Sequence, residues 1–375
     1  MKTTRLKICV ATIALAAITV LLVGCGGTTA GPLKIGADLT FSGPTAYWSE
    51  RIKLGLDLAV EQANAKGNER PIQIVYQDNQ ANPGQAVSIF QRLATVDNAS
   101  VILSCFTPIG KPLRSIAAQN KTPLLVTANS AIDFGLENEW SFRDFPPQDQ
   151  QGNIIADYSY NHLGVRRAGS LIVNDDFGRD GDKAFREEFA KLGGSIAPYE
   201  TVEQKDTDVR SQVTKVMSGN PDVVFMVIRD NTLGMAVRQL REIGYKGKIV
   251  GVINFDTRDA WRAAGPAGEG TIFTSAYIDF VTDPAAATFR EVFRTKYRGD
   301  EPEYLAVYGY TIGQYLADFL RQTGGDRAKM RQAISTLDRQ SIRGRIRMSS
   351  KREVLGPIGI YEFKDGRNQL ITRVE

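Results

Sequence analysis

The 375-residue sequence is poor in the side chains that most often catalyse reactions or bind metals, with one histidine and three cysteines. A Ser-His-Asp triad would have to use His162, and no G-x-S-x-G motif accompanies it. No P-loop is present, no G-x-G-x-x-G follows a strand, and no Cys/His cluster has metal-ligand spacing. We therefore predict that the protein is not an enzyme and uses no metal and no cofactor.

The sequence also carries little net charge. The formal net charge is +4, but Lys2, Arg5 and Lys7 lie in the first 24 residues, which contain no acid. Without these three, 43 of the 46 basic residues remain against 42 acidic ones, a net charge of about +1. This balance gives no electrostatic reason to expect nucleic-acid binding. The length favours two domains over a single core.

The N-terminus has the pattern of an export signal. The cationic stretch MKTTRLK precedes an apolar run at 8–23, which is short for a membrane span. The run ends in LVGC at 22–25, which resembles the lipobox of bacterial lipoproteins. We predict a signal peptide at 1–24 and a lipidated tether at 25–32, with the lipid on Cys25. The alternative is cleavage elsewhere, with Cys25 incidental.

Export and lipidation would place the mature protein in the periplasm or at the cell surface, held at the membrane by lipid only. Cys105 would then be the one other cysteine of the mature chain, so no intramolecular disulfide is expected. It lies in the apolar run SVILSCF and is predicted to be a buried structural thiol.

The body alternates apolar segments of strand length with amphipathic segments of helix length, a pattern typical of parallel β-α-β units. An irregular stretch with two prolines, FRDFPPQDQQGN at 142–153, indicates a crossing to a second unit. Before it, strands are predicted at 33–41, 72–79, 100–106 and 123–129, and helices at 50–67, 83–96 and 111–120. After it, strands are predicted at 168–175, near Tyr199, 223–228 and 248–254, and helices at 154–164, 181–193, 210–219 and 232–244.

The last third is mixed. A strand is expected at 270–277, and the C-terminus is predicted to form short strands joined by turns. Helices are expected at 284–297, 305–323 and 327–336. The predicted fold class is therefore α/β, with two doubly wound Rossmann-like lobes and a cleft between them.

Polar and aromatic residues follow several of the apolar strands. Trp48 follows the first strand, Thr107 the third, and Asn129 and Ser130 the fourth. In doubly wound sheets, ligands bind beyond the carboxyl ends of the strands, where hydroxyls and free N–H groups suit a carboxylate. The alternative is that Thr107 and Ser130 only cap their helices.

Arg229 directly follows the apolar run at 223–228. In one interpretation it lies at the surface and pairs with Asp230 or another acid, a pair that contributes about 0–1 kcal/mol. In the other it reaches into the cleft and binds a carboxylate with its planar guanidinium. The ligand would then be a dicarboxylate, an acidic amino acid or an aromatic acid. A branched-chain amino acid would leave a desolvated guanidinium unpaired.

Five stretches resemble segments of the branched-chain amino-acid-binding family of type I periplasmic solute receptors: LKIGADLTFSGPTAYW, GLDLAVEQANAKG, IQIVYQDNQANPGQAV, FRDFPPQDQQGN and NDDFGRDGDKAFREEFAKLGG. The resemblance extends from Leu33 to the C-terminus. It implies two α/β lobes joined by three crossovers, expected near 146–151, 254–256 and 341–345. The first lobe would comprise 33–147 plus 256–340, and the second 148–255 plus 341–375.

The resemblance also implies a function. We expect an extracytoplasmic solute-binding lipoprotein that captures an amino acid or related small carboxylate by lobe closure. It would deliver this ligand to ABC permease subunits and act as a monomer. Thr107 would contact the ligand carboxylate, and Phe177 would close over the ligand from the second lobe. The expected ligand-binding residues are Trp48, Thr107, Asn129, Ser130, Ala131, Phe177, Arg229, Asn254 and Asp256.

Three departures from the family pattern bear on the ligand. The acid that amino-acid receptors use for the ammonium group is missing at 253–254, although Asp256 follows. The frequent first-lobe disulfide is impossible because its upstream position is Ala81. Arg229 stands where an aromatic or small polar residue is usual. A ligand sensor of the same fold remains an alternative, and an exported enzyme is a third, disfavoured by the single histidine.

Overall fold

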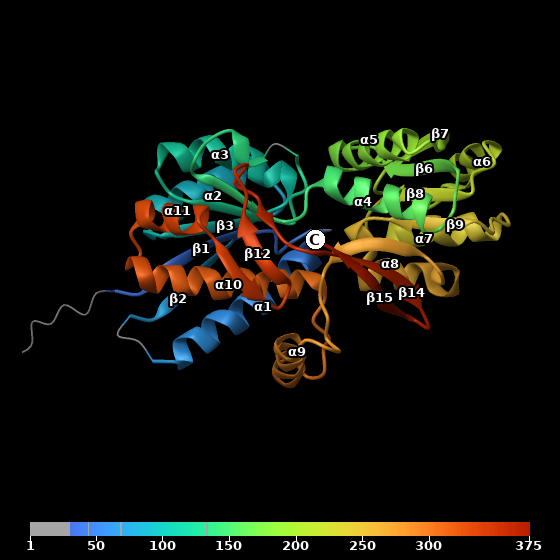
Figure 1. The fold of residues 1–375 in the computed structure, drawn as a ribbon. Coiled ribbons are helices and arrows are strands. Elements are labelled where there is room, and N and C mark those ends of the chain that lie inside the picture. Colours follow the sequence, from blue (N-terminus) through green and yellow to red (C-terminus); the bar gives the residue numbers. More distant parts are fainter. Residues whose placement is uncertain (1–30, 44, 68–69, 133) are drawn as a thin grey trace, which may run out of the picture.

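The computed structural model describes residues 31–43, 45–67, 70–132 and 134–375. The predicted signal peptide, Cys25 and most of the tether lie outside the described residues. Within the described part, two α/β lobes lie side by side and three chain segments connect them (Figure 1). No helix in this part is both long enough and apolar enough to cross a bilayer.

The first lobe is built on a five-stranded parallel sheet with strand order β2-β1-β3-β4-β5. Apolar side chains fill both faces of its central strands, as in parallel sheets covered by helices on both sides. The strands are β1 (Leu33–Leu39), β2 (Ile72–Asp78), β3 (Val101–Cys105), β4 (Leu124–Thr127) and β5 (Ser141–Asp144), and the helices between them are α1 (Ala46–Ala65), α2 (Pro83–Thr95) and α3 (Thr107–Gln119), with a 3-10 turn, η1 (Phe134–Leu136). Cys105 is fully buried, as predicted, and burial raises the pKa of its thiol to about 12.

The second lobe has a seven-stranded sheet with strand order β15-β14-β10-β9-β8-β6-β7. Phe225 of β8 stacks on Phe185 of α5 with 4.2 Å between ring centroids, in the core of this lobe. Its strands are β6 (Arg167–Val173), β7 (Ser195–Val202), β8 (Val223–Val227), β9 (Lys248–Gly251), β10 (Ile272–Ala276), β14 (Ile358–Lys364) and β15 (Arg367–Val374). Its helices are α4 (Gln148–Asn161), α5 (Asp176–Lys191), α6 (Arg210–Ser218), α7 (Asp230–Glu242) and α8 (Arg258–Ala264), with 3-10 turns η2 (Ile253–Phe255) and η3 (Gly265–Gly268).

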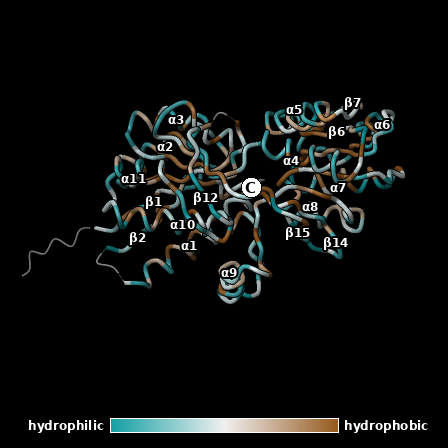
Figure 2. Tube along the Cα trace, viewed as in Figure 1, coloured by the Kyte–Doolittle hydropathy of each residue, from teal (hydrophilic) through white to brown (hydrophobic). Residues whose placement is uncertain are grey.

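The chain returns to the first lobe after β10. Helix α10 (Tyr304–Thr323) packs against α1, and its neighbours are α9 (Pro284–Lys296) and α11 (Arg327–Ser335). A small antiparallel sheet then forms from β11 (Asp338–Ser341), β12 (Gly344–Met348) and β13 (Val354–Leu355). Figure 2 shows hydrophobic segments concentrated inside each lobe and hydrophilic ones on the outer helices. Each lobe therefore has a core of its own, as the predicted fold class requires.

Two of the three predicted crossover positions are wrong. The chain crosses between β5 and α4, near the predicted 146–151, but also at 277–283 and 356–357. The segment 254–256 lies in and directly after η2, within the second lobe. The segment 341–345 spans the β11–β12 turn, which Arg343 holds to Asp144 of β5 with two hydrogen bonds of 2.9 Å.

These corrections change the predicted lobe limits at two places. Strand β10 was expected in the first lobe with 256–340, yet it pairs with β9 and β14 of the seven-stranded sheet. Strands β11 to β13 lie with the first lobe, although 341–375 was expected in the second. An apolar strand pattern does not identify the sheet that the strand joins, because its partners are distant in sequence.

Candidate functional site

A cleft of about 300 Å³ lies between the two lobes and is lined by residues from both. Its first-lobe wall follows the carboxyl ends of β1, β3 and β4, and its second-lobe wall follows β6, β7 and β8. Parallel strands present their carboxyl ends at one edge of a sheet, so residues distant in sequence meet there. Five of the predicted site residues line the cleft: Trp48, Thr107, Ser130, Phe177 and Arg229.

The first-lobe wall offers hydroxyl groups and the N-terminus of α3. Thr107 begins this helix, and no side chain caps it at Phe106. The Thr107 hydroxyl donates to Asn129 Oδ1 at 3.0 Å, and the same oxygen accepts the Ala131 N–H at 3.0 Å. Asn129 is fully buried and Ala131 nearly so, and neither lines the cleft. These two residues therefore fix the position of Thr107, and the helix N-terminus beside it favours a negative charge.

The backbone of this wall has a positive φ at three residues of the lining, Ala81 with φ 56° and two that directly follow strands. Phe106 has φ 70° and Ala128 has φ 48°, both in the left-handed region that non-glycine residues rarely adopt. Both residues line the cleft, directly after β3 and β4. Such conformations are unfavourable by about 1–3 kcal/mol each and occur most often at binding sites, where they direct backbone groups toward a ligand.

The second-lobe wall is organised around Arg229. Its Nη1 binds Asp175 Oδ2 at 2.7 Å, and its guanidinium carbon lies 4.2 Å from the centre of the Phe177 ring. Asp175 is also the N-cap of α5, since its Oδ1 accepts the Gly178 N–H at 3.1 Å. The other N–H groups of Arg229 have no partner within the described chain. Arg229 therefore pairs with an acid of its own lobe and faces the cleft at the same time.

Asn254 and Asp256 do not line the cleft. Asn254 is fully buried in η2 and donates to the carbonyl of Ile228. Asp256 accepts hydrogen bonds from Ser275 Oγ and Asn368 Nδ2, both at 2.6 Å. Burial raises the pKa of its carboxyl to about 6, although these hydrogen bonds act in the opposite direction. In this geometry both side chains support the second lobe behind the cleft.

Trp48 joins the lobes as well as lining the cleft. Its Nε1 donates to Asp230 Oδ1 at 3.1 Å, which connects α1 of the first lobe to the start of α7 in the second. Burial raises the pKa of Asp230 to about 6, partly offset by this hydrogen bond and by the charge of Arg229. The Trp48–Asp230 contact can exist only while the two lobes are together.

The remaining lining residues were not predicted from the sequence. They include two aromatic residues of the first lobe, Phe106 and Phe145, and two polar residues of the second, Asp175 and Gln204. Asp175 and Gln204 follow β6 and β7, so the rule that located Thr107 could have located them. Among the residues that the structure describes, Asp175 is the one acidic residue of the lining. No group of three His, Cys, Asp or Glu side chains that could hold a metal ion occurs within the described residues.

Comparison with protein families gives one match over most of the chain. Residues 32–367 match the sequence model of the family described as periplasmic binding protein. Among individual proteins, Leu/Ile/Val-binding protein homolog 2 of Brucella abortus (strain 2308) is 25% identical over 355 residues, which covers 92% of this chain and 94% of the relative.

Solved structures give the same picture at the level of the fold. The branched-chain amino acid transporter substrate-binding protein LivJ of Streptococcus pneumoniae, in complex with isoleucine, aligns with a TM-score of 0.84 and 22% identity. The alignment covers 91% of this chain and 98% of that one. A solute-binding protein of an ABC transporter from Rhodopseudomonas palustris BisB5, in complex with 3,4-dihydroxybenzoic acid, aligns with a TM-score of 0.82 and 23% identity over 92% of this chain and 97% of that one.

Proposed function

The chain belongs to the periplasmic binding protein family, in its branched-chain amino-acid-binding branch, and from this premise we propose that it is the substrate-binding lipoprotein of an ABC importer. It captures a small carboxylate between its lobes and delivers it to the permease. The protein provides no chemical step in this scheme: binding energy is used to hold the two lobes together around the ligand.

We further propose that the ligand is an apolar or aromatic acid without an ammonium group. One observation carries this proposal: Asp175, the one acid among the described residues of the lining, is already bonded to Arg229 at 2.7 Å. An α-amino acid would bring an ammonium group into a cleft where no unpaired carboxylate meets it, which is unfavourable in a desolvated site. Asp256 is the other acid that the sequence offered for binding an ammonium group, and it already accepts hydrogen bonds from Ser275 and Asn368.

The walls of the cleft suit the body of such an acid. Trp48, Phe106 and Phe145 line it from the first lobe, and Phe177 with the Arg229 guanidinium lines it from the second. Stacking between aromatic rings, and between a ring and a guanidinium, favours planar ligands. The carboxylate would lie between the start of α3, with Thr107 and Ser130, and the free N–H groups of Arg229. Isoleucine and 3,4-dihydroxybenzoic acid are the ligands of the two similar structures, and this arrangement favours the second chemistry.

A thermal-shift screen with calorimetric follow-up tests the ligand class. The panel pairs benzoate with benzamide, 3-phenylpropionate with phenylalanine, and 4-methylpentanoate with leucine, so that each comparison changes one charged group. A ligand at 100 times its dissociation constant stabilises the protein by about 2.7 kcal/mol, which a melting curve detects readily. We expect the acids to stabilise the protein and the amide and amino acids to fail. Stabilisation by leucine but not by 4-methylpentanoate would contradict the proposed ligand class.

A further inference from the structure

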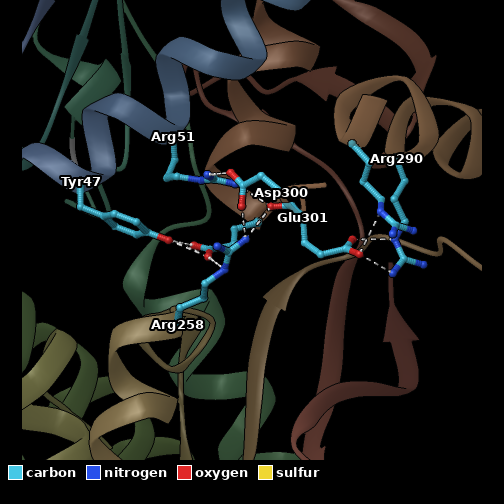
Figure 3. Close-up of polar contacts among 8 residues, drawn as sticks. Tyr47, Arg51, Arg258, Arg290, Asp300 and Glu301 are labelled. Atoms are coloured by element: carbon cyan, nitrogen blue, oxygen red, sulfur yellow. Dashed lines mark hydrogen bonds and ion pairs between the residues drawn. The ribbon is translucent and has the colours of Figure 1, made fainter. Parts of the chain in front are cut away.

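An acidic loop, residues 300–303 between α9 and α10, lies on the first lobe beside α1 (Figure 3). Arg51 of α1 binds the Asp300 carboxylate, and its Nη2 donates to the Glu301 carbonyl at 2.6 Å. Glu303 accepts a hydrogen bond of 2.6 Å from the Tyr47 hydroxyl. Arg51 is only 6% exposed, so this loop is held firmly to α1.

Arg258 approaches the acidic loop from the other lobe. It begins α8, which packs on α7 of the second lobe. Its Nη2 binds Asp300 Oδ1 at 2.6 Å, and its Nε binds Glu303 Oε1 at 2.6 Å (Figure 3). The same Nη2 donates to the Glu301 carbonyl at 3.0 Å. One side chain of the second lobe thus makes three contacts with one short segment of the first.

The charges of the first lobe are unbalanced without Arg258. The Glu301 carboxylate is bonded to Arg290 at 2.7 Å and to Arg294 at 3.4 Å, both on α9. Among the described residues of the first lobe, Arg51 is the one cation that binds Asp300, and its charge also acts on Glu303. Two carboxylates near one guanidinium attract a second cation, and Arg258 is placed as that cation when the lobes meet.

The burial of Glu303 strengthens this attraction. Its side chain is 10% exposed, and burial raises the pKa of its carboxyl despite the Tyr47 hydrogen bond and the charges of Arg51 and Arg258. Asp300 has the opposite balance: burial alone would raise its pKa, but hydrogen bonds from Arg51 and Arg258 lower it. Arg258 therefore stabilises the ionised form of both acids.

We propose that Arg258 is a positioning residue that controls ligand affinity from outside the cleft, because its ion pairs with the acidic loop form when the lobes close. The inference rests on lobe closure in the proposed function and not on the identity of the ligand. Contacts present only in the closed state raise its population, and the apparent dissociation constant falls in proportion for every ligand that binds this state. Arg258 lines no part of the cleft, so it cannot select between ligands.

The test compares Arg258→Gln with Arg262→Gln on the same helix. Arg262 is a matched control because its guanidinium binds Asp259 of its own helix at 2.7 Å and is 73% exposed. Small-angle scattering on the purified chain, without added ligand, measures the radius of gyration at low and high sodium chloride. We expect Arg258→Gln to expand the chain at low salt, whereas Arg262→Gln leaves its size unchanged. High salt should expand the wild type toward the Arg258→Gln value, because screening weakens exposed ion pairs. Arg258→Lys should restore part of the compaction.

Affinity provides the second readout. Calorimetry with benzoate and with 4-methylpentanoate should show both dissociation constants raised by the same factor, roughly 3- to 10-fold, since Arg258 is 48% exposed and its pairs are partly screened. Identical scattering of Arg258→Gln and Arg262→Gln at both salt concentrations would overturn the proposal. So would unequal factors for the two acids. If neither acid binds, the proposed ligand class fails, while the scattering comparison still decides the role of Arg258.

Discussion

The charge of the cleft depends on the residue with which Arg229 forms its ion pair. Its guanidinium is bonded to Asp175 at 2.7 Å and lies over the Phe177 ring at 4.2 Å, so the second-lobe wall contains a cation and an anion that cancel. A ligand carboxylate can still use the remaining N–H groups of Arg229, since a guanidinium has five donors. A ligand ammonium would have to compete with Arg229 for Asp175.

Replacing Arg229 should therefore change specificity as well as affinity. In Arg229→Gln, we expect benzoate to bind about 10- to 100-fold more weakly, the scale of a hydrogen bond to a charged group. The same variant frees Asp175, so the affinity for leucine should rise relative to that for benzoate. Arg179→Gln is the control, because Arg179 binds Asp176 and does not line the cleft. Calorimetry with benzoate and with leucine measures the two affinities. An unchanged ratio of these affinities would place Arg229 outside the ligand contacts.

Asp256 gives a prediction that depends on pH. Burial raises its folded-state pKa to about 6, above the value of 3.8 for an exposed carboxyl. Its stabilising contribution is therefore present below pH 3.8 and is lost as the pH rises through about 6. Asp256→Asn keeps both hydrogen bonds, since the amide can accept from Asn368 and donate to Ser275. We expect the variant to gain about 2 kcal/mol relative to the wild type between pH 4 and pH 7.5.

Urea unfolding at a series of pH values measures this gain. A constant difference between variant and wild type over that range would mean that Asp256 does not carry the raised pKa. Ligand affinity should be nearly unchanged in Asp256→Asn, because the side chain lies behind the cleft. A large loss of affinity would return Asp256 to the ligand contacts expected from the sequence.

At the scale of elements, the alternation of helices and strands could be predicted from the sequence because the apolar pattern of each element is local. The missed strand β5 shows the limit: its residues Arg143 and Asp144 are charged, yet both are fully buried. Their partners are Glu353 at 2.7 Å and Arg343 at 2.9 Å, roughly two hundred residues further along the chain. A short charged strand of this kind has no local apolar pattern, so only the tertiary structure reveals it.

In the candidate site too, some features could be predicted from local sequence and others could not. Thr107 and Ser130 could be expected because each directly follows an apolar strand. The sequence could not predict that Arg229 pairs with Asp175 and not with its neighbour Asp230, because this pairing depends on how two strand ends meet. Asp230 is bonded to Trp48 of the other lobe, a contact that no local pattern encodes.

The contact between α1 and α10 depends on small residues. A Cβ added to Gly309 would overlap the backbone carbonyl of Ile52, and one added to Gly55 would overlap that of Ala306. We expect Gly309→Ala to lower the free energy of unfolding by about 1–3 kcal/mol through overpacking, although alanine favours a helix more than glycine does. The exposed α2 residue Gln91 provides the control, since Gln91→Ala should change stability by less than about 0.5 kcal/mol. Equal urea midpoints for the two variants would contradict this close packing.

At the scale of the whole molecule, contacts between the lobes occur at several separate positions. Trp48 binds Asp230, Lys111 of α3 lies 3.8 Å from Asp176 of α5, and Arg258 binds the acidic loop. Three crossovers restrict the lobes to hinge motions, so these contacts form or break together. In the proposed function, closure is therefore determined by the sum of several modest contacts and the ligand, and we expect that any one of them can be altered without unfolding either core.

At the same scale, the proposed membrane anchor can be tested separately from ligand binding. The described residues that line the cleft all lie between Thr45 and Ile253, whereas the predicted lipid site is Cys25. Cys25→Ala should therefore move the protein from the membrane fraction to the soluble fraction and leave its affinity for benzoate unchanged. Cys105→Ala is the matched control, because this buried thiol lies in the core and its loss removes no anchor. Fractionation followed by immunoblotting reads the outcome, and a Cys25→Ala protein that stays with the membrane would rule out lipid on this residue as the means of attachment.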